Sequence, residues 1–138
     1  DKSEQSFITK HYSLPASPGI YTANLRGQLE LPKRVVTAAA ISEDGQTVVL
    51  LTYRFKMFLS FFPLTPADLF LFRDFEGTDF LSGQMQRKRG ARCLMPTQYE
   101  AVDFTGPNIV YIASERTPLF HQKAKRRKLP LIKADPQP

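Results

Sequence analysis

The feature that most constrains the fold is a strand–turn–strand pattern that occurs twice, about 62 residues apart. Residues 37–41, a turn and residues 48–54 align with residues 100–104, a turn and residues 110–116. In the first copy Asp44-Gly45 separates two apolar runs, which is a strong signal for a β-hairpin. No stretch of ten or more residues shows a helical apolar period, so we expect an all-β chain.

The apolar runs and the turn residues between them predict a succession of short strands. The first 19 residues contain Pro15, Pro18 and Gly19 and are expected to form an arm or loop. Residues 134–138 are expected to be a frayed tail. The expected strands are 20–24, 28–31, 35–41, 47–53, 68–74, 90–95, 99–104, 109–114 and 129–133.

A strand–turn–strand unit that recurs at a fixed period is typical of β-propeller blades and other β arrays. We therefore expect residues 20–133 to form about two four-stranded antiparallel blades, with repeat units at about 32–94 and 95–133. A propeller closes with ~4–8 blades, so such a ring would be incomplete. The chain is then expected to be part of a longer polypeptide or to complete its ring with another chain. A compact two-sheet fold, with chance similarity between two hairpins, is the alternative.

Several short motifs resemble a family of secreted bacterial β-propellers of mostly unknown function. Residues 36–53 resemble its "VTAAxISxDGxxVxLLTY" blade, and residues 74–83 resemble its "DYxGxDFFSG" stretch. Residues 98–102 and 112–115 are similar to motif pairs that also occur in SdiA-regulated and phytase-like esterase propellers. The sequence departs from the pattern at Ala101, where the related motif has glycine. The resemblance implies a propeller about twice this length in the bacterial envelope or outside the cell, and it implies no reaction.

The acidic residues offer one candidate metal site. Glu100 begins a strand expected to line the central channel, and Glu115 follows the second strand of the same unit. We expect the two carboxylates to approach each other and, with backbone carbonyls, to hold a hard cation such as Ca²⁺. The alternative is a structural role, in which a carboxylate accepts backbone N–H bonds or pairs with Arg116.

No pattern of nucleophilic residues predicts an active site within the chain. The two histidines, His11 and His121, have no Ser or Cys partner in a recognisable setting, and the single cysteine, Cys93, permits neither an intrachain disulfide nor a thiolate cage. We expect a non-enzymatic module. The alternative is a Ca²⁺-assisted esterase or phosphatase whose site is shared with further blades.

Two other clusters could contact partners. One is an apolar cluster between residues 55 and 64, where a connection between strands is expected. We expect it either to dock onto a protein or membrane surface or to fold back over a sheet. The basic cluster is the candidate anion-binding segment of a chain with a net charge of +6. A second basic stretch lies at residues 87–89, and we expect both to be solvated loops. The apolar cluster is Phe55, Phe58, Phe61, Phe62 and Leu64, and the basic one is Lys125, Arg126, Arg127 and Lys128.

The sequence thus predicts a binding or scaffolding segment in a bacterial envelope or secreted assembly. Its partner would be another protein chain or further blades of the same protein. The location would be periplasmic, cell-surface or secreted, with the sequence beginning after signal-peptide removal. A basic nucleic-acid-binding module is the remaining alternative, and no nucleic-acid-binding motif supports it. Residues 55–72 are too short and too interrupted to span a bilayer.

Overall fold

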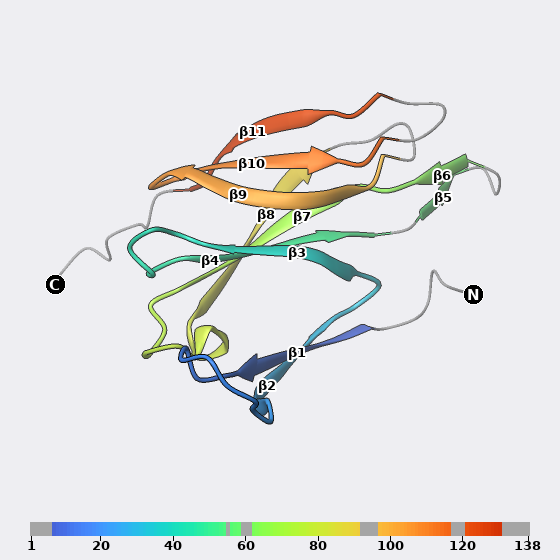
Figure 1. Ribbon diagram of the computed structural model, residues 1–138. Coiled ribbons are helices and arrows are strands. Elements are labelled where there is room, and N and C mark those ends of the chain that lie inside the picture. The colour runs from blue at the N-terminus through green and yellow to red at the C-terminus, as the bar shows by residue number, and fades with distance from the viewer. Residues whose placement is uncertain (1–6, 55, 59–61, 92–96, 117–120, 131–138) are drawn as a thin grey trace, which may run out of the picture.

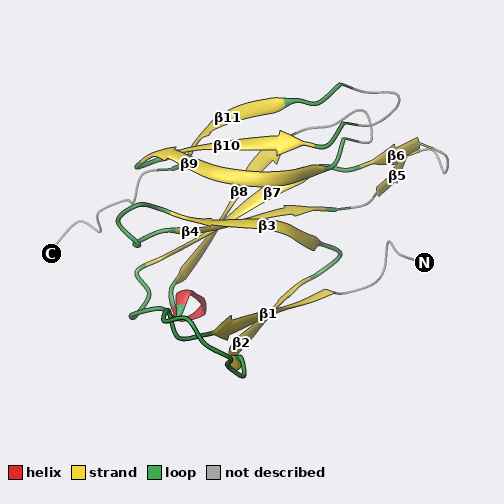
Figure 2. Ribbon diagram, viewed as in Figure 1, coloured by secondary structure: helices red, strands yellow, loops and turns green. Residues whose placement is uncertain are grey.

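Strands dominate the computed structural model, which describes residues 7–54, 56–58, 62–91, 97–116 and 121–130. Within those residues the regular structure is antiparallel β, apart from a single-turn 3-10 helix, η1, at Phe80–Ser82 (Figure 2). The strands are β1 Phe7–Ser13, β2 Asn24–Leu31, β3 Val35–Ile41, β4 Val48–Tyr53, β5 Lys56–Phe58, β6 Phe62–Leu64, β7 Ala67–Arg73, β8 Gln84–Ala91, β9 Tyr99–Gly106, β10 Ile109–Ser114 and β11 Ala124–Lys128.

The central layer is a four-stranded antiparallel sheet in the order β3-β4-β7-β8. Its two inner strands, β4 and β7, are nearly continuous apolar runs and are buried on both faces. Continuous apolar runs of this kind are expected where a sheet is covered from both sides. The predicted all-β fold is therefore confirmed, and the described sheets contain two, three or four strands.

A three-stranded sheet, in the order β11-β10-β9, covers one face of the central layer (Figure 1). Alternate residues of the facing strands fill the core between the two sheets, as the two-residue period of a strand requires. This core contains Val49, Leu51, Leu69, Leu71, Tyr99, Val102, Val110 and Ile112. A hydrogen bond from Thr37 Oγ1 to the carbonyl oxygen of Tyr99, at 2.9 Å, also joins β3 to β9.

The β1–β2 hairpin covers the opposite face and forms the third layer (Figure 1). Residues of the other parity, among them Leu50, Phe70 and Phe72, point into this second core and meet Leu29 and Leu31 of β2. The expected N-terminal arm thus contains a strand. The short strand expected at 20–24 is absent, and β2 runs without a turn from Asn24 to Leu31.

The β3–β4 and β9–β10 hairpins share one register, including an irregularity at the same aligned position. In the first hairpin Val36 pairs with Thr52 and Ala38 with Leu51, so that Thr37 is skipped. The second hairpin pairs Tyr99 with Ser114 and Ala101 with Ala113, so that Glu100 is skipped. Both skipped residues occupy the position that the sequence alignment equates. A β-bulge is a specific feature rather than an accident of strand pairing, so the two hairpins correspond along their strands from this bulge toward the turn. Next to its turn the second hairpin has a further irregularity, between Ile109 and Val110, that the first hairpin lacks.

Two basic segments expected to be loops are strands instead. The first, residues 87–89, belongs to β8, which begins at Gln84 and not at residue 90 as expected. The second forms β11, whereas the strand expected at 129–133 is not observed at Leu129 and Pro130. Residues 131–133 lie outside the described residues. Both strands are outer strands of their sheets, where charged side chains remain hydrated and discourage edge-to-edge pairing.

Candidate functional site

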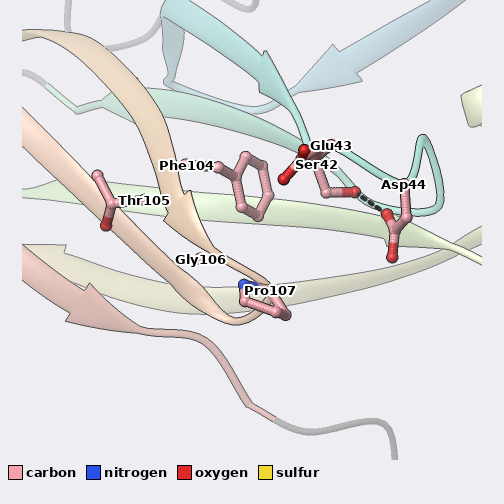
Figure 3. A pocket seen from close by; sticks show the side chains of 7 residues that line it. All are labelled: Ser42, Glu43, Asp44, Phe104, Thr105, Gly106 and Pro107. Carbon is pink, nitrogen blue, oxygen red and sulfur yellow. Dashed lines mark hydrogen bonds between the residues drawn. The ribbon is translucent and has the colours of Figure 1, made fainter.

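A groove lies between the two aligned turns, at the end of the stack where β3 meets β4 and β9 meets β10 (Figure 3). Its volume is about 520 Å³, within the range typical of small-molecule sites. The Glu43 side chain points toward the ring of Phe104 across this groove (Figure 3). The lining residues are Ser42, Glu43, Asp44, Phe104, Thr105, Gly106 and Pro107.

Hydrogen bonds fix the β3–β4 turn on one side of the groove. Ser42 Oγ donates to Asp44 Oδ1 at 2.6 Å and accepts the backbone N–H of Thr47 at 2.9 Å. Asp44 Oδ1 also accepts the backbone N–H of Gln46, and Gly45 takes the left-handed conformation that a tight hairpin turn requires. The Ser42 and Gln46 hydrogen bonds hold the pKa of Asp44 below its ordinary value, so this carboxylate is ionised at neutral pH.

Arg73 links the β3–β4 turn to the β9–β10 turn through side-chain hydrogen bonds. This buried side chain at the end of β7 donates from Nη1 to the carbonyl of Pro130 at 2.9 Å. It also donates from Nε to Thr47 Oγ1 and from Nη2 to Asn108 Oδ1. Burial lowers the pKa of the Arg73 guanidinium, which nevertheless remains protonated. The groove therefore lies between two turns whose separation is set by a buried cation.

The predicted carboxylate pair lies at the opposite end of the β9–β10 hairpin. Burial raises the pKa of Glu100, and a hydrogen bond and the negative charge of Glu115 raise it further. The structure thus brings the two predicted residues together, with Glu115 N donating to the carbonyl of Gln98. Among the residues the structure describes, no cluster of three His, Cys, Asp or Glu side chains could hold a metal. Since Ca²⁺ takes 6–8 oxygen ligands, a cation site here stays a prediction.

Near the same end of the central sheet, Asp68 is enclosed by two arginines. Arg34 Nη1 forms an ion pair with Asp68 Oδ2, and Arg87 Nη2 approaches the same oxygen at 3.0 Å. The side chains of Arg34 and Asp68 are only 6% and 5% exposed, whereas Arg87 is 52% exposed. Arg34 also lies 5.5 Å from the centroid of the Phe70 ring, and burial lowers its pKa despite the adjacent carboxylate.

Sequence analysis did not predict Arg34, Asp68 or Arg73 as site residues. The available signal was that Asp68 and Arg73 flank the apolar run of residues 69–72. Charged residues are seldom buried unless they are paired, so such positions indicate a partner. The partners themselves lie 34 residues away for Asp68 and 57 residues away, at Pro130, for Arg73. Nothing in the local pattern identifies them.

The predicted anion-binding residues alternate between two sides of β11. Lys125 Nζ lies 5.7 Å from the ring centroid of Tyr99, and Arg127 Nε donates to the carbonyl of Gly90 in the neighbouring sheet. Arg126 and Lys128 are exposed on the other side of the strand. The four cations therefore do not form one continuous patch on a single face.

The predicted apolar cluster falls on a small hairpin that leaves the central sheet (Figure 1). Its strands β5 and β6 pair so that Phe58 lies opposite Phe62 and Lys56 opposite Leu64. Phe55 and Phe61 lie outside the described residues. Partner binding by this cluster stays a prediction.

No family model, curated protein or solved structure matched the chain. In the described part of the chain, no helix has the length and apolar character needed to cross a membrane.

Proposed function

We propose that this chain is a non-enzymatic binding or scaffolding module built from β-propeller-type sheets. The observation that carries the proposal is the correspondence of the β3–β4 and β9–β10 hairpins, which share register and bulge in two sheets stacked face to face. Propeller blades bury their apolar faces by this kind of stacking. On this proposal, residues 32–94 and 95–133 are blades, and β1–β2 belongs to a preceding blade.

One end of the stack offers a surface for a further sheet. On the outer side of the β1–β2 hairpin, Ile8, Tyr12 and Leu25 are exposed, and Tyr12 is directly paired with Leu25. Apolar side chains gathered on an uncovered sheet face favour contact with another sheet. The proposed partner is therefore another protein chain, or another part of the same protein, that presents a sheet of this type.

The proposed location is the bacterial envelope or the extracellular space. The support is the resemblance of residues 36–53 and 74–83 to secreted propellers. Fractionation of the source cells, followed by immunoblotting, tests the location. Recovery of the protein only with cytosolic markers contradicts it.

The docking surface is tested by measuring the association state of the purified chain by sedimentation equilibrium, from micromolar to near-millimolar concentration. We expect concentration-dependent association through the β1–β2 face. The double variant Ile8→Thr with Tyr12→Thr should weaken it, because threonine preserves strand propensity while removing apolar area. Ile20→Thr is the matched control, since Ile20 is fully exposed outside the strands. A folded monomer at every concentration, or equal association of both variants, contradicts the proposal.

A further inference from the structure

Two basic segments that are far apart in the sequence lie on neighbouring edges of the stack. Strand β8 is the last strand of the central sheet, and β11 is the last strand of the three-stranded sheet. Lys88 Nζ donates to the carbonyl of Lys128, and Arg127 Nε donates to the carbonyl of Gly90, so the two edges are in direct contact. We call these two adjoining edges the basic ridge; it comprises Arg87, Lys88, Arg89, Lys125, Arg126, Arg127 and Lys128. Lys88 and Arg127 reach across between the sheets, so Arg87 and Arg89 lie on the opposite side of the ridge from Arg126 and Lys128.

The basic ridge concentrates the positive charge of the molecule. It contains seven of the 19 Lys and Arg residues, and neither β8 nor β11 contains an Asp or Glu. Asp68 partly neutralises Arg87, but it lies buried behind the ridge. Arg89, Arg126 and Lys128 are exposed, and Arg87 is half exposed. The ridge therefore presents a positive field to solvent that the overall net charge of +6 only partly reflects.

An exposed aromatic ring lies beside the cations on the outer face of the three-stranded sheet. Tyr111 of β10 is 43% exposed, because its neighbours Val110 and Ile112 take the buried positions of the strand. Tyr111 is directly paired with Arg126, whose side chain lies on the exposed side of β11. Directly paired residues have Cβ atoms about 4.5–5.5 Å apart, so ring and guanidinium share one surface.

We propose that the β11 side of the basic ridge, where Arg126 and Lys128 lie on the same face as Tyr111, binds single-stranded nucleic acid. Exposed arginines pair with backbone phosphates, and the face of Tyr111 offers a platform on which a base stacks. A sulfated polysaccharide would use the cations but has no π-face for the ring. Asp103, which pairs with Tyr111 from the other side, repels phosphates and directs the strand toward β11. This inference goes beyond the proposed scaffolding role and requires that no further sheet covers the outer face of the three-stranded sheet. It revises the sequence-based expectation, in which the two basic segments were separate loops.

The test is fluorescence anisotropy of a labelled oligothymidylate titrated with the whole chain. The two exposed cations on the face of Tyr111 predict a slope of log affinity against log salt near −1.4, which is roughly a sevenfold loss between 50 and 200 mM salt. Arg126→Gln combined with Lys128→Gln should weaken binding and make this slope shallower. Lys10→Gln is the matched control, because Lys10 is an exposed cation on β1, away from the ridge. Circular dichroism confirms that each variant is folded.

The decisive variant is Tyr111→Leu. Loss of one stacked base should weaken oligothymidylate binding about fivefold or more at every salt concentration without changing the slope. Binding of dextran sulfate, measured in parallel, should be unaffected by the same change. The proposal is overturned if the oligomer does not bind at low salt, if Lys10→Gln weakens binding as much as the ridge variant, or if Tyr111→Leu binds the oligomer as tightly as the wild type.

Discussion

Asp68 is the residue whose replacement should most reduce the stability of the central sheet. Its carboxylate is 5% exposed and is the counter-charge of Arg34, which is 6% exposed. Asp68→Ala leaves a buried guanidinium without its partner, and breaking a buried pair in this way costs about 3–5 kcal/mol. For a chain of 138 residues, that loss lowers the melting temperature by about 10–17 °C.

Two further variants separate the buried pair from the surrounding contacts. Arg34→Met combined with Asp68→Leu removes both charges and leaves side chains of comparable volume, so it should recover most of the loss. Arg87→Gln should cost about 1 kcal/mol or less, because Arg87 is 52% exposed and its ion pair is screened by water. We therefore expect Asp68→Ala to lower the free energy of unfolding more than either the double variant or Arg87→Gln does.

The assay is urea unfolding followed by far-ultraviolet circular dichroism, because the chain has no tryptophan. A stability change appears as a lower midpoint with an unchanged slope. If Asp68→Ala does not fold, Asp68→Asn retains the volume and still removes the charge. A loss below about 1 kcal/mol for the single variant, or a double variant as unstable as the single one, refutes the reasoning.

Two predictions concern the ends of the hairpins. The folded chain holds the Glu100 proton more tightly than the unfolded chain does, so its free energy of unfolding falls as pH rises above the ordinary value of 4.5. Glu100→Gln should remove this contribution and gain stability relative to the wild type at pH 7 but not at pH 4; equal pH profiles from urea unfolding contradict it. Ser42→Ala should cost about 1–2 kcal/mol and raise the pKa of Asp44 toward 3.8, as followed by carboxyl-carbon NMR, because it removes the principal hydrogen bond to that carboxylate. An unchanged Asp44 titration would show that Gln46 alone holds the turn.

Runs of apolar and β-branched residues made several strands predictable from the sequence, both at a sheet edge (β3) and inside a sheet (β10). Strands β3 and β10 have the bounds expected, Val35–Ile41 and Ile109–Ser114. Strand β1 was missed for the opposite reason. Its partly buried positions include Thr9 and His11, whereas Ile8 and Tyr12 are exposed. A pattern of hydrophobicity therefore indicates the wrong face of this strand or no strand at all.

The edge strands β8 and β11 were hidden by their charge. A sheet edge is protected by the same Lys and Arg residues that make a sequence resemble a solvated loop. Residues 125–128 form a strand because their backbone pairs with β10. The position of β8 beside β11 depends on packing between two sheets. Neither contact can be recognised from the residues that surround these strands in the sequence. The proximity of Glu100 and Glu115 could be predicted from the sequence, because both residues belong to one hairpin. The pairing of Arg34 with Asp68 could not be predicted, because it depends on contacts between distant segments.

The matched bulges lead to a last prediction about docking. Thr37, skipped in the first hairpin, donates its hydroxyl to the Tyr99 carbonyl of the next sheet. Glu100 is skipped at the equivalent position of the β9–β10 hairpin, in the next sheet of the stack. If a further sheet stacks on β9 as β9 stacks on β3, a backbone carbonyl will face Glu100. A protonated carboxyl group donates to a carbonyl oxygen, whereas a carboxylate repels it.

Association through the outer face of β9 should therefore weaken as pH rises and Glu100 ionises, because burial and the neighbouring Glu115 raise the pKa of Glu100 but do not prevent its ionisation. Glu100→Thr restores the donor found at Thr37 and should associate equally at pH 5 and pH 7.5. Glu115→Gln, which keeps the titrating residue, should still associate less at the higher pH. Sedimentation equilibrium at both pH values measures the three proteins. Wild-type association that is independent of pH, or a pH dependence that persists in Glu100→Thr, would mean that the bulge positions of successive sheets do not perform equivalent roles.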